Sequence, residues 1–356
     1  MRVVVAMSGG VDSAVTAALL AGAGHDVIGI TLQLYDHGAA SGRKGACCAG
    51  QDIYDAKAVA DCLGIRHYVI DAEERFHQAV IENFAASYAA GVTPVPCVRC
   101  NQSVKFTDLL ALARDLGAEA LATGHYVRRL EKPDGIQLCR AKDLARDQSW
   151  FLFATTCEQL AFCRFPLGEM DSKATVRRTA AQFNLPVANK PDSQDLCFAP
   201  SGHYAELVSK LHPEAGEEGE ILTEDGALLG RHSGIAHFTV GQAKRLGPAR
   251  VYAGRQQVVV AIDAGRRRVI VGPRDTKRSV IRLHQLNWLI EAPDREKPVD
   301  VKLRARDNMR RARVVATGTD TAEVIMDEPA LPAPGQACVF YEGERVLGGG
   351  FILEAT

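Results

Sequence analysis

The sequence predicts an α/β fold in which a doubly wound parallel sheet is followed by a small β-rich domain and a C-terminal β-barrel. Short apolar strands and helical segments alternate through residues 1–200, which is the pattern of a parallel sheet with crossover helices. From about Gly216 the pattern changes to short alternating segments separated by Asp-Gly, Gly-Arg and Pro-Gly turns, which is typical of β-rich modules. The length of 356 residues supports more than one domain, because a single hydrophobic core rarely serves so long a chain.

The first part of the chain supplies the elements of the parallel sheet in order. Apolar runs of strand length predict strands at residues 3–6, 27–34, 67–70 and 120–123. Longer segments with helical composition and periodicity predict helices at residues 12–23, 52–63, 75–86, 103–116 and 172–183. The turn sequence Pro133-Asp134-Gly135 stands between two alternating runs and predicts a β-hairpin. In sheets of this kind, ligands bind beyond the carboxyl ends of the strands.

Domain boundaries are expected near residues 200 and 275. They divide the chain into a sheet domain at 1–200, a small central domain at 201–275 and a barrel at 276–356. Residues 250–316 contain 17 Lys and Arg against 7 Asp and Glu, although the whole chain has a net charge of −1. Such a local excess predicts either a polyanionic partner or a solvated basic face. Within it, the alternating run Lys302-Leu303-Arg304-Ala305-Arg306 predicts three charges on one face of a strand.

The chain is expected to be a cytosolic protein. No apolar run approaches the roughly 20 residues that a membrane-spanning helix needs. The apolar N-terminal run ends at Ser8-Gly9-Gly10, which is typical of a buried first strand and not of a signal peptide. In a reducing compartment, clustered cysteines among the ten of this chain are more often catalytic or metal-binding than disulfide-bonded.

The run Ser8-Gly9-Gly10-Val11-Asp12-Ser13 follows the first predicted strand and opens the first predicted helix. Its glycines allow a tight turn that brings backbone N–H groups against an anion, and the helix N-terminus and two serine hydroxyls favour the same ligand. The run therefore predicts a phosphate site. It lacks the Gly-Lys-Ser/Thr of a Walker A loop and the Gly-x-Gly-x-x-Gly of a dinucleotide site. Asp12 is a candidate Mg²⁺ ligand or, alternatively, a helix cap.

Three cysteines stand in distinctive segments. Cys97 and Cys100 lie in a Pro-rich segment just before the helix predicted from residue 103, and Cys197 follows the run Lys190-Pro191-Asp192-Ser193-Gln194-Asp195-Leu196. A thiol near a helix N-terminus with Arg99 and Lys105 close by is expected to have a lowered pKa, which favours nucleophilic attack and metal binding. The Cys-x-x-Cys pair alone also fits half of a zinc site or a redox pair.

The remaining cysteines carry no comparable signal. Cys47 and Cys48 precede the second predicted helix and are expected to be bystanders or auxiliary thiols. The others stand in apolar patterns and are expected to be core residues: Cys62, Cys139, Cys157, Cys163 and Cys338.

The phosphate loop matches the PP-loop family, whose members split ATP between the α- and β-phosphates and retain pyrophosphate in this loop. Together with the cysteine segments, further motifs resemble the tRNA-specific 2-thiouridylases. These motifs are Ala122-Thr123-Gly124-His125-Tyr126, Asp147-Gln148-Ser149, Phe165-Pro166-Leu167-Gly168, Gly230-Arg231-His232-x-Gly234, Phe238-Thr239-Val240-Gly241-Gln242 and Pro334-Gly335-Gln336. The matches run from residue 3 to beyond residue 340, so the resemblance covers nearly the whole chain.

The resemblance implies two sets of binding residues. ATP contacts are implied at Ala6, Met7, Ser8, Gly9, Gly10, Val11, Asp12, Ser13, Leu32 and Gly124, the last because a side chain there is expected to obstruct the adenine. Contacts with the anticodon arm of tRNA are implied at His125, Asp147, Gln148, Ser149, Arg304, Ala305 and Gln336. His125 also fits a general acid or a structural histidine, and residues 147–149 also fit a polar turn.

The resemblance further implies the chemistry at the cysteines. Cys100 matches the family's nucleophile and Cys197 its persulfide-bearing cysteine, so that ATP adenylates the C2 oxygen of the wobble uridine and the persulfide sulfur replaces it. Cys100 then resolves the persulfide, which leaves a Cys100–Cys197 disulfide. This sequence has Cys97 where one branch of the family has Asp. Three thiolates, Cys97, Cys100 and Cys197, can instead hold a [4Fe–4S] cluster with one open iron, and both mechanisms remain open. The expected sulfur donor is a cysteine desulfurase, a persulfide carrier protein or free sulfide.

Two other functions keep the phosphate loop. A PP-loop ligase or a 4-thiouridine synthase is the enzymatic alternative, although a ligase has no need of three cysteines in these segments. An RNA-binding module with ATP as a structural ligand is the non-enzymatic alternative, and tRNA-dependent turnover of ATP to AMP would exclude it.

Overall fold

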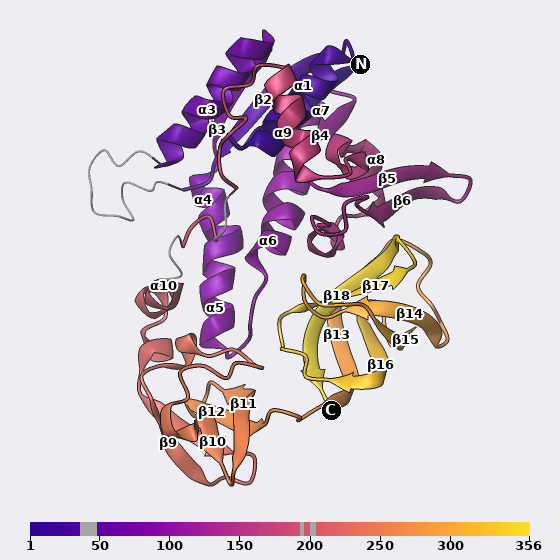
Figure 1. The fold of residues 1–356 in the computed structure, drawn as a ribbon. Coiled ribbons are helices and arrows are strands. Elements are labelled where there is room, and N and C mark those ends of the chain that lie inside the picture. The colour runs from indigo at the N-terminus through magenta and orange to yellow at the C-terminus, as the bar shows by residue number, and fades with distance from the viewer. Residues whose placement is uncertain (36–47, 193–195, 200–203) are drawn as a thin grey trace. The chain divides into compact units, whose positions relative to one another are not determined.

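The computed structural model describes residues 1–35, 48–192, 196–199 and 204–356 (Figure 1). The chain forms two compact units. Unit 1 contains Met1–Ala79, Val98–Phe198 and Glu344–Val346, and unit 2 contains Val80–Cys97, Ala199–Gly343 and Leu347–Thr356. The chain therefore passes between the units several times, and no single position in the sequence separates them.

The centre of unit 1 is a five-stranded parallel sheet. Its strands are ordered β3 (Arg66–Asp71), β2 (Asp26–Gln33), β1 (Arg2–Ala6), β4 (Ala120–Ala122) and β7 (Cys163–Arg164). The predicted parallel sheet is confirmed, with strands within one or two residues of the predicted bounds. β7 was not predicted, because two residues are too few to show a pattern. The strand order reverses between β1 and β4, and ligands in such sheets bind at that point of reversal.

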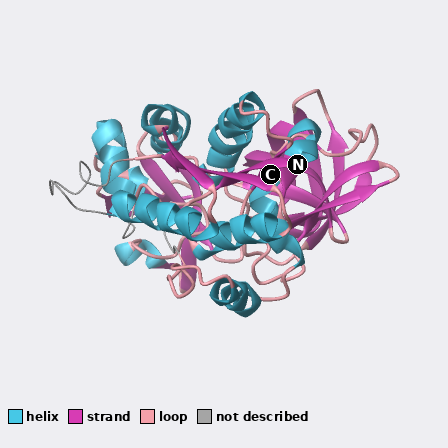
Figure 2. Ribbon diagram, turned by 90° about the horizontal axis from the view of Figure 1, so that it is seen from above, coloured by secondary structure: helices cyan, strands magenta, loops and turns pink. Residues whose placement is uncertain are grey.

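Helices flank this sheet, as Figure 2 shows in cyan. α1 (Val11–Gly22) packs on β1 and β2 through a face of alanine and valine side chains, and α3 (Cys48–Leu63) packs on β2 and β3. α9 (Lys173–Gln182) packs against α1, and its N-terminus is capped by Ser172, whose side chain accepts a hydrogen bond from the backbone N–H of Thr175. α8 (Cys157–Phe162) begins with a capping box between Thr156 and Gln159.

Two helical runs contain π-helical stretches. The first consists of α4 (Glu73–Phe76), a π-helix at His77–Glu82 and α5 (Asn83–Ala89). The second consists of α6 (Pro96–Arg99), a π-helix at Cys100–Leu109 and α7 (Leu110–Asp115). The second run was predicted to begin at residue 103, and this prediction is wrong: Pro94-Val95-Pro96 suggests a loop, but proline is well tolerated at the first position of a helix. Cys97 and Cys100 are therefore helical residues.

A hairpin completes unit 1. β5 (Val127–Lys132) and β6 (Gly135–Arg140) pair antiparallel around the predicted turn. Arg345 pairs with Cys139 on the other side of β6, which accounts for the inclusion of residues 344–346 in this unit. Short 3₁₀ turns lie at Ser149–Leu152 and Pro166–Glu169 in this unit, and at Pro213–Gly216, Ile235–His237 and Gly247–Arg250 in unit 2.

Unit 2 contains a small mixed sheet and one further helix. The sheet is ordered β10 (Val251–Tyr252), β11 (Arg255–Asp263), β12 (Arg268–Pro273), β8 (Gly219–Thr223) and β9 (Leu228–His232). α10 (Tyr204–Leu211) packs on α5, where the ring of Tyr204 lies 5.0 Å from that of Tyr88 between centroids. The β-rich character predicted after residue 216 is confirmed.

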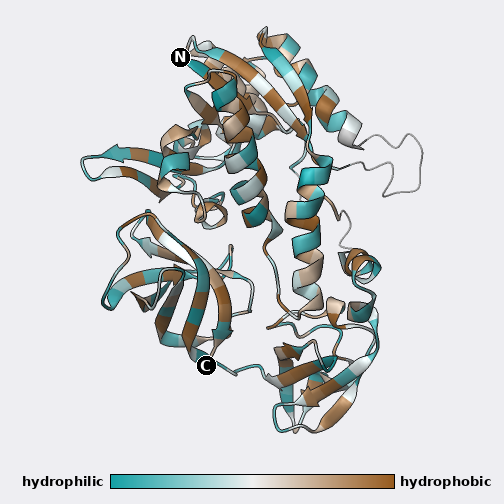
Figure 3. Ribbon diagram, turned by 180° about the vertical axis from the view of Figure 1, so that it is seen from behind, coloured by the Kyte–Doolittle hydropathy of each residue, from teal (hydrophilic) through white to brown (hydrophobic). Residues whose placement is uncertain are grey.

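Unit 2 also contains a closed β-barrel, as predicted. Six strands follow the order β13 (Arg278–Trp288), β16 (Thr321–Ala330), β15 (Arg310–Ala316), β14 (Lys297–Lys302), β17 (Ala337–Glu342) and β18 (Arg345–Ala355), and pairing of β13 with β18 closes the ring. Polar and apolar residues alternate along these strands, as Figure 3 shows in teal and brown, and the inward side chains form one core.

The expectation of three basic side chains on one strand face is wrong. β14 ends at Lys302, which is buried, and its Nζ donates a hydrogen bond to the carbonyl of Ala305 at 2.8 Å. Arg304 and Arg306 lie beyond the strand and are exposed. The alternating sequence pattern extends beyond the end of β14, because the chain turns after Lys302 where the strand was expected to continue.

Candidate nucleotide and cysteine site

The phosphate loop lies between β1 and α1, at the carboxyl edge of the sheet. Gly9 has a φ of +73°, and a side chain on it would collide with the backbone of Asp52 on α3. Ser13 braces the turn: its Oγ accepts from the N–H of Ser8 at 3.1 Å and donates to the carbonyl of Gly10 at 3.0 Å. Gly10 is the N-cap residue of α1, and no side chain at this position accepts a hydrogen bond from the helix. The first backbone N–H groups of α1 are therefore directed out of the helix end. This arrangement suits an anion.

Gly124 follows β4 and faces the same loop. A Cβ at this position would lie 2.9 Å from the backbone carbonyl carbon of Asp12 and 2.9 Å from the backbone nitrogen of Ser13. The glycine is therefore required by close packing against the start of α1, which is a different reason from the predicted clearance for adenine. Leu32 lies near the carboxyl end of β2 and is partly exposed. Both residues thus lie at carboxyl ends of strands, where sheets of this kind bind ligands.

Asp12 does not cap α1, which corrects one of the two predicted roles. Both of its carboxylate oxygens accept hydrogen bonds from Nζ of Lys173 at 2.8 Å, and Oδ1 also accepts from the hydroxyl of Tyr126 at 2.6 Å. Burial and the hydrogen bond with Asp12 raise the pKa of Tyr126, so the phenol stays protonated and remains a donor. The carboxylate is thus oriented by two donors from other segments.

Lys190 ties the other side of the loop to α3. Its Nζ donates to the carbonyl of Gly9 at 3.0 Å and to Oδ1 of Asp52 at 2.7 Å, and it also pairs with Asp55. Partial burial lowers the pKa of Lys190, but the two carboxylates outweigh this effect and raise the pKa above its ordinary value. The ammonium therefore stays charged and fixes the peptide of Gly9.

Cys100 is buried in the first turn of the π-helical stretch, 8 % exposed. Burial raises the pKa of its thiol, and the opposing effect of the Lys105 ammonium is smaller. The expectation of a lowered pKa is therefore wrong for Cys100, because the helix begins at Pro96 and places this thiol inside the fold. Cys97 and Cys197 are exposed. Cys100 and Cys197 belong to unit 1 and Cys97 to unit 2.

The other cysteines differ in burial. Cys139, Cys163 and Cys338 are buried, as expected for core residues, whereas Cys62 and Cys157 are exposed on helices, which corrects that expectation. Cys47 lies outside the described residues, and Cys48 is the first residue of α3.

His125 lies close to Lys105 and among aromatic rings. Its ring centroid is 6.0 Å from that of Phe106 and 6.5 Å from that of Phe165, and its Nδ1 hydrogen-bonds with the hydroxyl of Thr123 at 2.8 Å. Burial, reinforced by the Lys105 charge, holds the pKa of His125 well below its usual range. The imidazole is neutral at pH 7 and is suited to hydrogen bonding or stacking.

The segment 147–149 is packed into unit 1. The Asp147 carboxylate is nearly buried and accepts from the N–H of Ala141, the N–H and hydroxyl of Ser149, and Nε of Arg140. Gln148 accepts from the N–H of Tyr126 at 2.9 Å through Oε1. These bonds favour the polar-turn role for Asp147 and Ser149, and only Gln148 has a partly exposed side chain.

The remaining predicted tRNA contacts lie in unit 2. Arg304 is exposed, and its Nη2 donates to the carbonyl of Val240 at 3.3 Å. Ala305 and Gln336 are partly exposed, and Nε2 of Gln336 donates to the carbonyl of Thr93 at 3.2 Å. Their contacts with tRNA stay predictions.

In the described part of the chain, no set of donor side chains is assembled that could hold a metal cluster. Within those residues, no group of three His, Cys, Asp or Glu side chains is placed to hold a metal ion, and Cys97, Cys100 and Cys197 are all among the residues described. The described residues therefore give no support to a [4Fe–4S] cluster. Over the same residues, no helix has the length and apolar character needed to cross a membrane.

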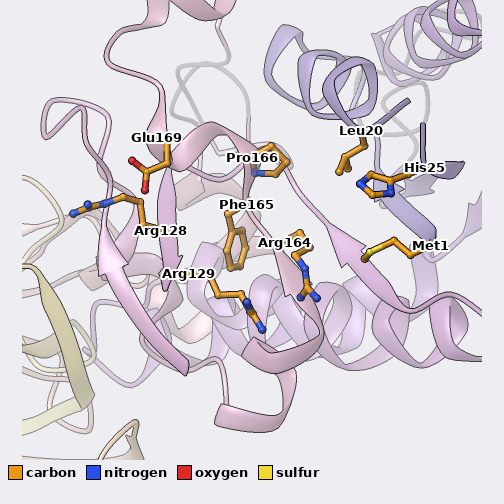
Figure 4. A pocket seen from close by; sticks show the side chains of 9 residues that line it. All are labelled: Met1, Leu20, His25, Arg128, Arg129, Arg164, Phe165, Pro166 and Glu169. Carbon is orange, nitrogen blue, oxygen red and sulfur yellow. The ribbon is translucent and has the colours of Figure 1, made fainter. Parts of the chain in front are cut away.

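A hollow of about 290 Å³ lies elsewhere in unit 1, near the C-terminal end of α1. Figure 4 shows Arg128, Arg129, Arg164 and His25 among its lining residues. The guanidinium groups are engaged: Arg128 pairs with Glu344, Arg129 pairs with Glu131, and Arg164 donates to two backbone carbonyls. This hollow is separate from the phosphate loop.

The sequence predictions missed Lys173, Lys190, Asp192 and Tyr126 as residues around the loop. Lys190 and Asp192 stand in the motif that precedes Cys197, and Tyr126 stands in the motif around Gly124. The sequence motifs could therefore have identified these three residues. Nothing in the sequence pairs Lys173 with Asp12, because 161 residues separate them.

Comparison with known proteins agrees with this arrangement. Family models described as the tRNA methyl transferase HUP domain, the tRNA methyl transferase PRC-barrel domain and the aminomethyltransferase beta-barrel domain match residues 1–211, 206–273 and 278–352. A tRNA-specific 2-thiouridylase MnmA from Acidiphilium cryptum is 64% identical over 99% of this chain and 100% of its own length. Proteins of the same name from Gluconobacter oxydans and Rhodospirillum centenum are 61% and 56% identical, each over 99% of this chain and over 99% and 92% of their own lengths. The chain therefore belongs to the tRNA-specific 2-thiouridylase family.

Proposed function

We propose that this chain uses ATP to replace the C2 oxygen of the wobble uridine of tRNA with sulfur. The observation that carries the proposal is the phosphate loop at the point of strand reversal, in the same unit as Cys100 and Cys197. Identity of 64% to a tRNA-specific 2-thiouridylase over 99% of the chain supports the same reaction.

The reaction begins with adenylation. The C2 oxygen of uridine attacks the α-phosphate of ATP, the bond to the β-phosphate breaks, and pyrophosphate leaves. The N–H groups at the start of α1 and the hydroxyls of Ser8 and Ser13 stabilise the departing pyrophosphate. Mg²⁺ would neutralise phosphate charge, and Asp12 would hold it once its carboxylate is released from Lys173.

Sulfur transfer follows at the cysteines. The persulfide on Cys197 attacks C2 of the adenylated base, the C2–O bond breaks, and AMP leaves with its electron pair. Cys100 attacks the sulfur of Cys197, so the S–S bond of the persulfide breaks and a Cys100–Cys197 disulfide forms, which a cellular thiol must reduce. Because burial raises the pKa of Cys100, its proton has to be removed for this step, and the nearby Lys105 cation favours the thiolate. No step is assigned to a [4Fe–4S] cluster.

The tRNA is held through its anticodon arm by residues of both units. Gln148 and the neutral His125 are the candidates in unit 1, and Arg304, Ala305 and Gln336 are those in unit 2. Asp147 and Ser149 act indirectly in this proposal, by fixing the backbone around Gln148. The exposed thiol of Cys197 suits sulfur delivery from a cysteine desulfurase or a persulfide carrier protein.

The first test follows the fate of ATP. Incubation with labelled ATP and tRNA lacking 2-thiouridine should yield AMP and pyrophosphate, and Asp12→Ala should slow this reaction at least about tenfold, since positioning supplies most of the catalysis. Formation of ADP and phosphate, or AMP formation at the same rate without tRNA, would contradict the proposal.

A further inference from the structure

The peptide that opens the phosphate loop is held by hydrogen bonds on both of its polar groups. Just before it, the N–H of Met7 continues the β1–β2 ladder by donating to the carbonyl of Ile30 at 2.8 Å. The carbonyl of the Met7–Ser8 peptide accepts from the hydroxyl of Thr31 at 2.8 Å. The N–H of the same peptide donates to Oγ of Ser13 at 3.1 Å. The direction of this peptide therefore depends on one side chain from β2 and one from α1.

His67 on β3 determines the direction of the Thr31 hydroxyl. Nε2 of His67 lies 2.8 Å from Oγ1 of Thr31. A hydroxyl has one hydrogen and a carbonyl can only accept, so Thr31 donates to Met7 and its oxygen accepts from His67. The imidazole therefore carries a proton on Nε2. Burial lowers the pKa of His67 and outweighs the raising effect of the Asp61 carboxylate, so the ring is neutral at pH 7.

Gly29 provides the space for this hydrogen-bond network. A Cβ at Gly29 on β2 would overlap the sulfur of Met7 and lie 3.2 Å from the ring of His67. The Thr31 side chain lies in the interior, because the residue is only 4% exposed. Removal of its hydroxyl would take one hydrogen bond from the Met7 carbonyl and one from His67, and such losses cost more in the interior than at the surface.

The Met7–Ser8 peptide also orients Ser13 at the start of α1. Because Oγ of Ser13 accepts from the N–H of Ser8, its own hydrogen is directed to the carbonyl of Gly10 at 3.0 Å. Rotation of the peptide would withdraw that N–H and allow the Ser13 side chain and the first turn of α1 to shift. Since donors bind an anion best when they are already aimed at it, this rotation should weaken phosphate binding.

We propose that Thr31 is a positioning residue of the phosphate loop and that His67 acts through it. The series of donors runs from Nε2 of His67 through the hydroxyl of Thr31 to the carbonyl of Met7. Neither side chain is assigned a contact with the nucleotide, and both act on ATP binding through the direction of one peptide. This inference rests on the proposed function, because it takes the loop to be the ATP site.

Calorimetric titration of the full chain with a non-hydrolysable ATP analogue and Mg²⁺ tests the role of Thr31. Thr31→Val keeps the shape of the side chain without its hydroxyl and should weaken analogue binding about tenfold, the factor expected for one buried hydrogen bond. Thr31→Ser keeps the hydroxyl, and its affinity should stay within about twofold. Thr179→Val is the matched control, because it removes a hydroxyl of the same unit that donates to the carbonyl of Thr175, and its affinity should not change.

Further variants test whether His67 acts through Thr31. His67→Phe keeps a ring without the donor and should weaken binding about threefold, less than Thr31→Val because Thr31 can still donate to Met7. His67→Gln places an amide N–H near the position of Nε2 and should recover the affinity. In the double variant of Thr31→Val with His67→Phe, the loss should equal that of Thr31→Val alone.

Thermal unfolding of the same variants separates positioning from stability. A lower melting temperature in Thr31→Val with unchanged analogue affinity would show a purely structural role and overturn the inference. Additive losses in the double variant would overturn the part assigned to His67. If Thr31→Val does not fold, equal affinities of His67→Phe and His67→Gln would overturn the series of donors.

The proposed function would survive each of these results, since tRNA-dependent formation of AMP is measured separately. Failure of the unmodified chain to bind the analogue would instead overturn the ATP site, and this inference with it.

Discussion

At the scale of single residues, the buried thiol of Cys100 determines how the reaction should depend on pH. Burial raises the pKa of Cys100, and the reactive form is the thiolate, so the rate of the resolving step should rise with pH through neutrality and beyond the usual range of a cysteine. Lys105 opposes this effect, and removing its charge should raise the pKa further.

The Lys105 variant gives a direct measurement. Lys105→Met should shift the pH profile of Cys100 alkylation to higher pH and lower the rate at pH 7 by several-fold, about tenfold per unit of pKa. Lys142→Met, which removes an exposed lysine of the same unit, is the matched control. An unchanged profile in Lys105→Met would show that this cation does not act on the thiol.

Cys197 should be needed for chemistry and not for substrate binding. Cys197→Ser is expected to abolish 2-thiouridine formation, because serine cannot carry a persulfide, while tRNA affinity stays within about twofold. Cys157→Ser, at another exposed cysteine of unit 1, should retain activity. Full activity of Cys197→Ser would remove the assigned role.

At the scale of secondary-structure elements, the site depends on the close approach of the end of β4 to the start of α1. In Gly124→Ala the new methyl group would lie 2.9 Å from the backbone of residues 12 and 13. We expect loss of about 1–3 kcal/mol of unfolding free energy and a clear loss of ATP affinity, because the loop must shift. Gly230→Ala is the control, since open space surrounds that position. Calorimetric titration with an ATP analogue checks both variants, and equal affinities would contradict this account.

The elements could be predicted from sequence where a local pattern carried the information. Strands β1, β2, β3 and β4 and the turn between β1 and α1 show local patterns and were found, whereas the two-residue strand β7 was not. The start of α6 was missed because a proline-rich segment resembles a loop, and the error placed Cys100 at an exposed helix end instead of inside the fold. The Lys173–Asp12 pair could not be found, because only the packing of α9 on α1 brings these residues together.

At the scale of the whole molecule, the basic segment at residues 250–316 has fewer charges available to a polyanion than its composition suggests. At least nine of its 17 basic residues already pair with carboxylates: Arg255, Arg266, Arg267, Arg268, Arg278, Arg282, Lys297, Arg311 and Arg313. Arg304 is exposed, and its Nη2 donates to the backbone carbonyl of Val240, so its charge is not offset there by a carboxylate and suits contact with a phosphate.

This difference predicts unequal effects on tRNA binding. Arg304→Ala should weaken binding and reduce the slope of log affinity against log salt by about 1, as expected for one lost phosphate contact. Arg311→Ala, which removes another exposed arginine that pairs with Asp300, should change both quantities much less. Filter binding across a salt series measures both, and equal slopes for the two variants would contradict the assignment.

The most direct test of the central claim is an anaerobic reaction of the purified chain with ATP, unthiolated tRNA and a cysteine desulfurase with cysteine as the persulfide source, followed by nucleoside mass spectrometry. 2-Thiouridine should form at the wobble position only when ATP is present, and none should form with Cys197→Ser. Absence of any thiolated base, even after addition of a persulfide carrier protein, would contradict this reaction and favour a PP-loop ligase.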